Sequence, residues 1–239
     1  MAIRPAFFPD INVKGFVKRE NIDFEWFPGF SIIQKQRSIN SLHNSISKVN
    51  SSLKPLEISS KSEQPLGVSL SAFNLMIETK NNKKFSVEMA FQSSKVFEGG
   101  GPFIDLLEGD SRTAKKDSRL KNSGKLLYFQ YFKRRWPLDP KTMFYDWLYI
   151  NALSLNTDLS NELSKYNVFT DIEFNPEKSI NCQANSAALY VALKELDLLE
   201  YVLDSVENYI EILGDSLLDK SEKQNLAKVQ YHQLDLFDD

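Results

Sequence analysis

The most informative stretch of the chain reads Ser86-Val87-Glu88-Met89-Ala90-Phe91-Gln92-Ser93-Ser94-Lys95. On a helix, where successive residues turn by about 100°, Glu88, Gln92 and Lys95 share one side. They span about 10 Å along the axis, beside a mostly apolar side of the same helix. Such a row of carboxylate, amide and ammonium can bind and cleave a polar, charged ligand. The same spacing also fits a solvated helix face with an ordinary Glu and Lys, and spacing alone favours this second interpretation.

Composition and periodicity predict a helix-rich α+β protein. The 239 residues are enough to bury a large core, and 42% hydrophobic with 26% charged residues is typical of a globular chain. Apolar spacing predicts helices over residues 32–49, from 86 to a stop at the glycines 99–101, and over 103–107, 111–120, 141–151, 160–166, 183–193 and 196–213. In the first of these helices the residues expected to face inward are Ile32, Ile33, Ile39, Leu42, Ile46 and Val49. Short strands and turns are expected over 5–35, a strand over 73–79 and a surface loop over 50–64.

The stretch from Ser86 to Lys95 resembles the signature of the NADAR family of YbiA-like proteins, Ser/Thr-x-Glu-His-x-Tyr/Phe-Gln-x-x-Lys. Met89 stands where that signature has His. Three other segments are similar to family features: a Leu-Ser-Asn-Phe-like turn, a basic residue near a Trp, and an Asn that opens a small-residue helix. They are Leu70-Ser71-Ala72-Phe73-Asn74, in which the Asn is displaced, Arg135-Trp136, and Asn185-Ser186-Ala187-Ala188-Leu189.

Other segments resemble the NADAR proteins found beside DarT-type toxins, which attach ADP-ribose to DNA bases. These segments are Arg4-Pro5 and residues 30–36, 56–62 and 169–176. The resemblance implies an antitoxin glycohydrolase that removes ADP-ribose from guanine in ADP-ribosylated DNA, with the DarT-type toxin as a further partner. Two alternatives stay open: an N-glycosidase acting on a small ribosylated metabolite, and a protein that sequesters the toxin without chemistry.

The resemblance also implies a division of the chain. A compact YbiA-like NADAR core is expected over residues 67–198. Residues 1–66 would form an N-terminal extension of strands and turns packed on this core, and residues 199–239 a C-terminal helix with an acidic tail.

Candidate site residues follow from the chemistry of an N-glycosidic bond, which breaks with oxocarbenium-like character and needs a carboxylate and an acid. Glu88 is the first candidate because it occupies the central acid of the motif. Asp171 and Glu173 would share a face of an extended segment and supply the second carboxyl group, although a turn acid that caps the next helix explains them as well. The expected substrate-binding residues are Ser71, Phe73, Asn74, Phe91, Gln92, Lys95, Arg119, Arg135, Trp136 and Asn185.

Several of these residues have a plain structural alternative. Lys95, assisted by Arg119 or Arg135, would hold the pyrophosphate of ADP-ribose. Trp136 offers a stacking face for a base but equally fits a buried core position. Phe73 and Phe91 fit either a pocket wall or the core.

Charge is unevenly distributed along the chain. The net charge of −3 argues against binding undamaged DNA through global electrostatics. Residues 112–135, however, carry nine basic side chains against one acid, a net charge of +8, and residues 195–239 carry three lysines against twelve acids, a net charge of −9. A local basic region suits a phosphate-rich ligand, and a solvated basic loop is the alternative.

The sequence also allows expectations about cofactors and the cellular compartment. It has no cluster of His and Cys with metal-ligand spacing, so we expect metal-independent chemistry without a cofactor. The single cysteine, Cys182, excludes an internal disulfide, fits a reducing compartment and reads as a small buried hydrophobe. No apolar run approaches the length of a membrane span, so we expect a cytoplasmic protein without a membrane partner.

The end of the chain carries a separate motif, Gln233-Leu234-Asp235-Leu236-Phe237. It resembles the short peptides that dock bacterial proteins onto the DNA sliding clamp through a Gln and spaced apolar anchors. The sliding clamp is therefore a candidate partner, with Gln233, Leu234, Leu236 and Phe237 as the docking residues. The alternative is that Leu234 and Phe237 pack back on the domain.

Overall fold

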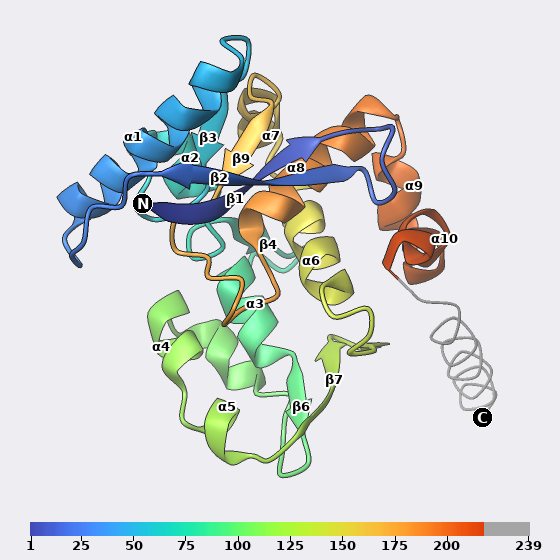
Figure 1. The fold of residues 1–239 in the computed structure, drawn as a ribbon. Helices are drawn as coiled ribbons and strands as arrows, with labels where there is room; N and C mark the ends of the chain where they lie inside the picture. Colours follow the sequence, from blue (N-terminus) through green and yellow to red (C-terminus); the bar gives the residue numbers. More distant parts are fainter. Residues whose placement is uncertain (218–239) are drawn as a thin grey trace.

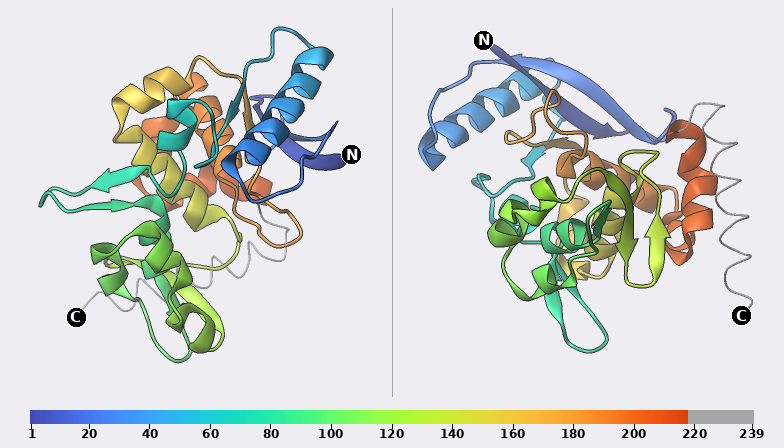
Figure 2. Two further views of the ribbon diagram at one scale, coloured as in Figure 1. Left: turned by 90° about the vertical axis from the view of Figure 1, so that its left-hand side faces the viewer. Right: turned by 90° about the horizontal axis from the view of Figure 1, so that it is seen from below.

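The computed structural model describes residues 1–217, and the candidate clamp peptide at 233–237 lies outside this range. The protein has an α+β fold, as predicted, with small sheets and surrounding helices (Figures 1 and 2). The strands are β1 (Ala2–Pro9), β2 (Val17–Phe24), β3 (Pro55–Glu57), β4 (Met76–Glu78), β5 (Lys84–Ser86), β6 (Lys95–Phe97), β7 (Leu126–Tyr131), β8 (Arg134–Trp136) and β9 (Val168–Thr170). The helical elements are α1 (Ile32–Val49), α2 (Pro65–Ser69), α3 (Val87–Ser93), η1 (Ile104–Glu108), α4 (Ser111–Lys116), α5 (Arg119–Asn122), α6 (Met143–Ser154), α7 (Thr157–Leu163), α8 (Gln183–Glu195), α9 (Leu199–Asp204) and α10 (Val206–Leu217).

The largest sheet has four strands in the order β2-β1-β9-β3. Strand β9 is antiparallel to β1 and parallel to β3. Because side chains alternate along a strand, Ala6 and Val168 pack under α1, whereas their neighbours Phe7 and Phe169 pack into the main core on the other face. The sheet therefore joins two cores, one beneath α1 and one around α6 and α8.

Helix α6 forms the centre of the main core. Its sequence is apolar on every side, which is typical of a buried helix, and ten of its twelve side chains are buried. Helix α8 packs against it through small residues such as Ala184, Ala187 and Ala188, all fully buried. The Tyr149 hydroxyl donates a hydrogen bond to the Leu70 carbonyl over 2.7 Å, so α6 also fixes the turn that follows α2.

The helix expected from residue 86 to the glycines ends earlier, at Ser93. The hydroxyls of Ser93 and Ser94 donate back to the carbonyls of Ala90 and Phe91, over 3.0 and 2.8 Å, and such bonds compete with helix continuation. The Ser94 carbonyl accepts instead from Gln130 in β7, over 2.7 Å. Residues 95–97 become strand β6 in a three-stranded antiparallel sheet with β7 and β8, so the prediction was wrong for this part.

The surface loop expected over residues 50–64 was also wrong in its centre. Residues 55–57 form β3, and Leu56 and Ile58 are fully buried. The error has a physical cause: three residues carry too short a pattern to reveal a strand, and the pairing partner β9 lies over 110 residues away. The apolar stripe over 196–213 likewise forms two helices rather than one, because Ser205 is extended and separates α9 from α10.

Helix α1 spans the predicted residues, and Ile39, Leu42 and Ile46 are buried as expected. The apolar residues at its ends, which periodicity placed inside, are exposed instead. Ile32 is 54% exposed, Ile33 69% and Val49 77%. Within residues 1–217, no helix has both the length and the apolar character needed to cross a membrane.

Candidate active site

A cavity of about 1400 Å³ lies between α3, α4, the segment that follows β9, the start of α8 and the segment that follows β3. Nine of the residues predicted from the sequence line it, drawn from three separate segments of the chain. They are Ser71, Phe73, Asn74, Glu88, Phe91, Gln92, Lys95, Asp171 and Glu173.

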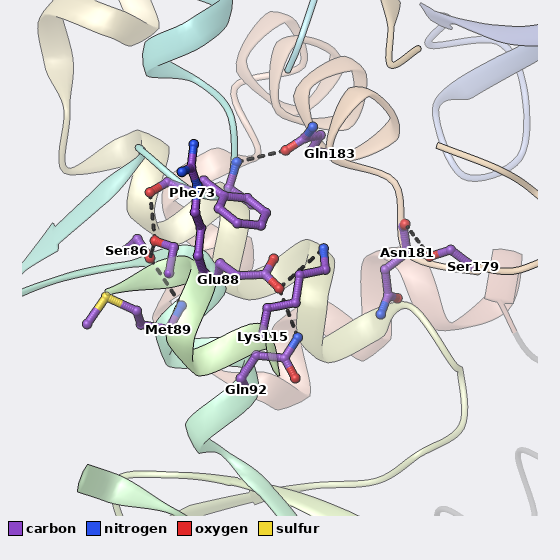
Figure 3. A network of polar contacts seen from close by, with 12 residues as sticks. Phe73, Ser86, Glu88, Met89, Gln92, Lys115, Ser179, Asn181 and Gln183 are labelled. Carbon is purple, nitrogen blue, oxygen red and sulfur yellow. Dashed lines mark hydrogen bonds and ion pairs between the residues drawn. The ribbon is translucent and has the colours of Figure 1, made fainter. Parts of the chain in front are cut away.

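One wall of the cavity carries the motif row in the predicted order. The Glu88 side chain is buried and accepts a hydrogen bond from Gln92 Nε2 at Oε1, over 2.9 Å. Gln92 Oε1 in turn accepts from Lys95 Nζ over 2.7 Å, so the row survives although Lys95 belongs to a strand. Ser86 begins the helix by accepting the Met89 backbone N–H at its hydroxyl (Figure 3). The start of α3 thus fixes Glu88 one turn above Gln92.

A second lysine, missed among the candidates, faces the same carboxylate. Lys115 Nζ in α4 lies 3.5 Å from Glu88 Oε1 and 4.8 Å from the centre of the Phe73 ring (Figure 3). Lys95 Nζ lies 4.8 Å from the centre of the Phe91 ring. Burial, with a smaller effect of Lys115, lowers the pKa of Lys95 to about 8, whereas Glu88 acts in the opposite direction. Two ammonium groups therefore border the Glu88 carboxylate within the cavity.

Asp171 and Glu173 are near in sequence but have different surroundings. The chain turns after β9, and Asp171 Oδ1 accepts the backbone N–H groups of Glu173 and Phe174 over 3.0 and 3.2 Å. Asp171 is 8% exposed, whereas Glu173 is exposed and pairs with Lys35 over 3.0 Å. The prediction of an extended segment with both acids on one face was therefore wrong. Asp171 is a turn acid, as in the alternative, but it does not cap a helix, because the next helix, α8, begins at Gln183.

The Asp171 carboxyl group is held in a state that favours its proton. Burial, followed by repulsion from the buried Glu57, raises the pKa of Asp171 well above the usual range of aspartate. Burial also raises the pKa of Glu57. Its carboxyl group accepts hydrogen bonds from the Ile172 N–H over 2.8 Å and from the Thr170 hydroxyl over 2.7 Å. Asp171 thus lines the cavity as a carboxyl group that can donate a proton near neutral pH.

Gln183, at the start of α8, links the two walls of the cavity. Its Nε2 donates to Asp171 Oδ2 over 3.0 Å and to the Ile58 carbonyl over 2.6 Å. Its Oε1 accepts the Ala72 N–H over 2.7 Å (Figure 3). The Ala72 carbonyl accepts the N–H of Glu88 over 2.8 Å, so a continuous path of hydrogen bonds runs from Asp171 to the backbone of Glu88.

Tyr145 in α6 is another lining residue that the sequence did not single out. Its ring meets Phe91 edge-on, with centroids 5.1 Å apart and planes at 88°. Burial first and then the Glu88 carboxylate raise the pKa of the Tyr145 hydroxyl well above the usual value, with Asp171 contributing in the same direction. The hydroxyl therefore keeps its proton and can donate a hydrogen bond to a ligand that lies between the two acids.

Four predicted binding residues lie outside this cavity. Arg119 pairs with Asp105 and Asp117, over 2.6 and 2.9 Å. Arg135 is exposed and sits over the Tyr128 ring, whereas Trp136 is 1% exposed and packs in the core. Asn185 lines a second cavity, of about 320 Å³, which shares the lining residue Phe174 with the first. The core alternative thus describes Trp136.

Two further positions of the family motif have structural roles. Met89, in place of the motif His, is 5% exposed and belongs to the main core, outside the cavity lining. Asn74 Nδ2 donates to the Val68 carbonyl and to the Ser71 hydroxyl, over 2.9 and 3.0 Å, and so holds the turn that follows α2. Cys182 is buried. Among residues 1–217, no group of three or more His, Cys, Asp or Glu side chains is placed to hold a metal ion.

Comparison with known proteins agrees with the motif. A family model described as the DarT1-associated NADAR antitoxin matches residues 2–223, almost the whole chain. No curated protein sequence matches it. The chain belongs to the family of DarT1-associated NADAR antitoxins.

Proposed function

We propose that this antitoxin is a glycohydrolase, which removes ADP-ribose from guanine in DNA that a DarT-type toxin has modified. The observation that carries the proposal is the pairing of Glu88 and Asp171 across one cavity, with Lys95 and Lys115 beside the carboxylate. In this proposal Glu88 acts as the carboxylate and Asp171, whose pKa burial raises, as the proton donor, which is the division of roles that glycosidic bond cleavage needs.

The lysines supply the binding site for the pyrophosphate of ADP-ribose. Lys95 is half-buried and hydrogen-bonded to Gln92, so its ammonium group is held in place before the ligand arrives. Lys115 is more exposed and lies at the edge of the cavity. Charge-assisted hydrogen bonds from such groups to phosphate oxygens are among the stronger polar contacts in proteins. The ribose attached to this pyrophosphate would then lie next to Glu88.

The reaction breaks the bond between the anomeric carbon of the ribose and the guanine nitrogen. Asp171 gives its proton to the leaving nitrogen, and the Tyr145 hydroxyl donates a hydrogen bond to the bound sugar. Glu88 stabilises the positive charge that develops on the ribose and accepts a proton from the attacking water, whose oxygen bonds to the anomeric carbon. The products are unmodified guanine in DNA and free ADP-ribose, and proton exchange with solvent restores both acids.

A growth assay in cells that express the toxin distinguishes this proposal from sequestration of the toxin without chemistry. Glu88→Gln keeps the size of the side chain and an oxygen that can accept from Gln92. Under our proposal, cells that express the toxin with Glu88→Gln stop growing, whereas cells with the wild-type antitoxin grow. The matched control is Glu78→Gln, in the exposed β4–β5 hairpin, which should protect fully. Full protection by Glu88→Gln at equal protein level would instead support sequestration without chemistry.

A further inference from the structure

The N-terminal end of α1 presents apolar side chains to solvent. Phe30 is fully exposed, and Ile32 and Ile33, in the first turn of the helix, are 54% and 69% exposed. These three residues, called here the α1 tip, lie within four consecutive positions of the sequence. Apolar side chains gathered at one exposed place mark interaction sites more often than single exposed ones do. Folding of the domain gives no reason for them, because the core beneath α1 begins at Ile39.

One ion pair connects the start of α1 to the lining of the cavity. Lys35, one helical turn after Ile32 and on the same face, pairs with Glu173 over 3.0 Å, and Glu173 lines the cavity. The Lys35 side chain is only 16% exposed and sits 5.0 Å from the centre of the Trp26 ring, so the start of the helix is firmly held. Figures 1 and 2 show the first turns of α1 beside the orange segment that follows β9.

The charge around the α1 tip suits a polyanion. Between Trp26 and Leu56 the chain has no acidic residue. Lys35 and Arg37 follow the α1 tip within two helical turns, whereas Lys48 and Lys54 lie at and beyond the other end of α1. Across the cavity, Arg112 and Lys115 line the opposite edge. A strand of nucleic acid with one nucleotide in the cavity would therefore meet basic side chains on both sides.

We propose that the α1 tip holds the DNA strand next to the modified guanine, with Phe30 stacking on a neighbouring base. This inference rests on the proposed function, since it assumes that the guanine in the cavity is still part of DNA. A base that enters a closed pocket leaves the stack, and an exposed aromatic ring replaces part of the stacking that is lost. Ile32 and Ile33 then cover the apolar face of that base, while the exposed Arg37 lies near the phosphates.

The test compares two substrates with and without flanking DNA. One is an oligonucleotide carrying a single ADP-ribosylated guanine, and the other is ADP-ribosylated guanosine. Phe30→Ser should lower kcat/KM about tenfold on the oligonucleotide, in the range of a lost base–aromatic contact, and leave guanosine turnover unchanged. Phe30→Trp should retain oligonucleotide turnover. Val49→Ser, at the exposed other end of the same helix, is the matched control and should change neither value.

Other outcomes overturn the inference. An equal loss on both substrates would mean that Phe30 shapes the cavity rather than holding DNA. Unchanged oligonucleotide turnover together with weaker binding of the toxin by Phe30→Ser would assign the α1 tip to the toxin. If the wild type releases ADP-ribose from neither substrate, the proposed function fails. In that case the α1 tip proposal is tested by the affinity for the modified oligonucleotide. Equal affinity of the wild type and Phe30→Ser would refute this proposal as well.

Discussion

Gln183→Leu tests the hydrogen-bonded link between the two walls of the cavity. The wild-type amide makes three hydrogen bonds, to Asp171, to the Ile58 carbonyl and from the Ala72 N–H. Ala72 is 2% exposed and Ile58 fully buried, so water does not readily replace the lost partner. Leaving a buried polar group without a partner costs about 1–3 kcal/mol. With two backbone groups affected, and a small gain from the apolar leucine, we expect a loss of about 3 kcal/mol.

The assay is urea unfolding followed by fluorescence, with thermal melting as a second measurement. For a chain of this length, about 3 kcal/mol corresponds to a fall of about 6–12 °C in Tm. The same substitution at Gln36, in α1, is the control, because the described structure shows no hydrogen bond for that side chain, and it should stay within about 0.5 kcal/mol of wild type. Since the amide also stabilises the charged form of Asp171, its loss should raise the pKa of Asp171 further and move the alkaline limb of activity to higher pH. A Gln183→Leu protein with the wild-type urea midpoint, slope and pH profile would refute the reasoning.

Three further predictions follow from the same structure. Because the pKa of Lys95 is lowered to about 8, its ammonium group loses its charge as pH rises through 8, and KM should rise over the same range. Lys95→Arg stays charged at these pH values, so steady-state kinetics should show no such rise in its KM. Burial raises the pKa of Asp146 to about 6, so the folded state holds its proton more tightly than the unfolded chain, and stability is lost as pH rises from about 4 to 6. Asp146→Asn can still accept a hydrogen bond from Ser186 and does not titrate. Its free energy of unfolding should therefore rise relative to that of the wild type by up to about 3 kcal/mol between pH 4 and 7 in urea unfolding. A difference in free energy of unfolding that is the same at pH 4 and pH 7 would contradict this prediction. Tyr145→Phe should lower kcat at least about tenfold while KM changes little, because the hydroxyl acts on the reacting sugar, and a rise in KM alone would show a binding role.

The sequence predicts those parts of the site that depend on local spacing. Glu88 and Gln92 are four residues apart, so any helix through them brings their side chains together. Lys95 reaches Gln92 although the helix has already ended, because the chain enters β6 on the same side of the cavity. Lys95 therefore lies on the predicted side with Glu88 and Gln92, but the prediction that a helix places it there was wrong.

Contacts between distant segments could not be predicted in this way. Gln183 reaches Ala72 across 111 residues, and nothing in its local pattern distinguishes it from a solvated glutamine. Lys115 is one of nine basic residues in its region, and only the fold decides that it faces Glu88. Arg135 and Trp136 are adjacent on a strand, where neighbours point to opposite faces, so a joint role for the pair was geometrically unfavourable.

The direct test of the central claim is release of ADP-ribose from DNA by the purified protein. The substrate is an oligonucleotide that the toxin has modified at guanine, and mass spectrometry follows both the free ADP-ribose and the mass of the DNA. We expect the wild type to restore the unmodified oligonucleotide. Glu88→Gln should do so at least about 100-fold more slowly, the range of a lost acid–base group, while binding the modified DNA and unfolding like the wild type. Release by Glu88→Gln at the wild-type rate, or no release by the wild type, would contradict the account.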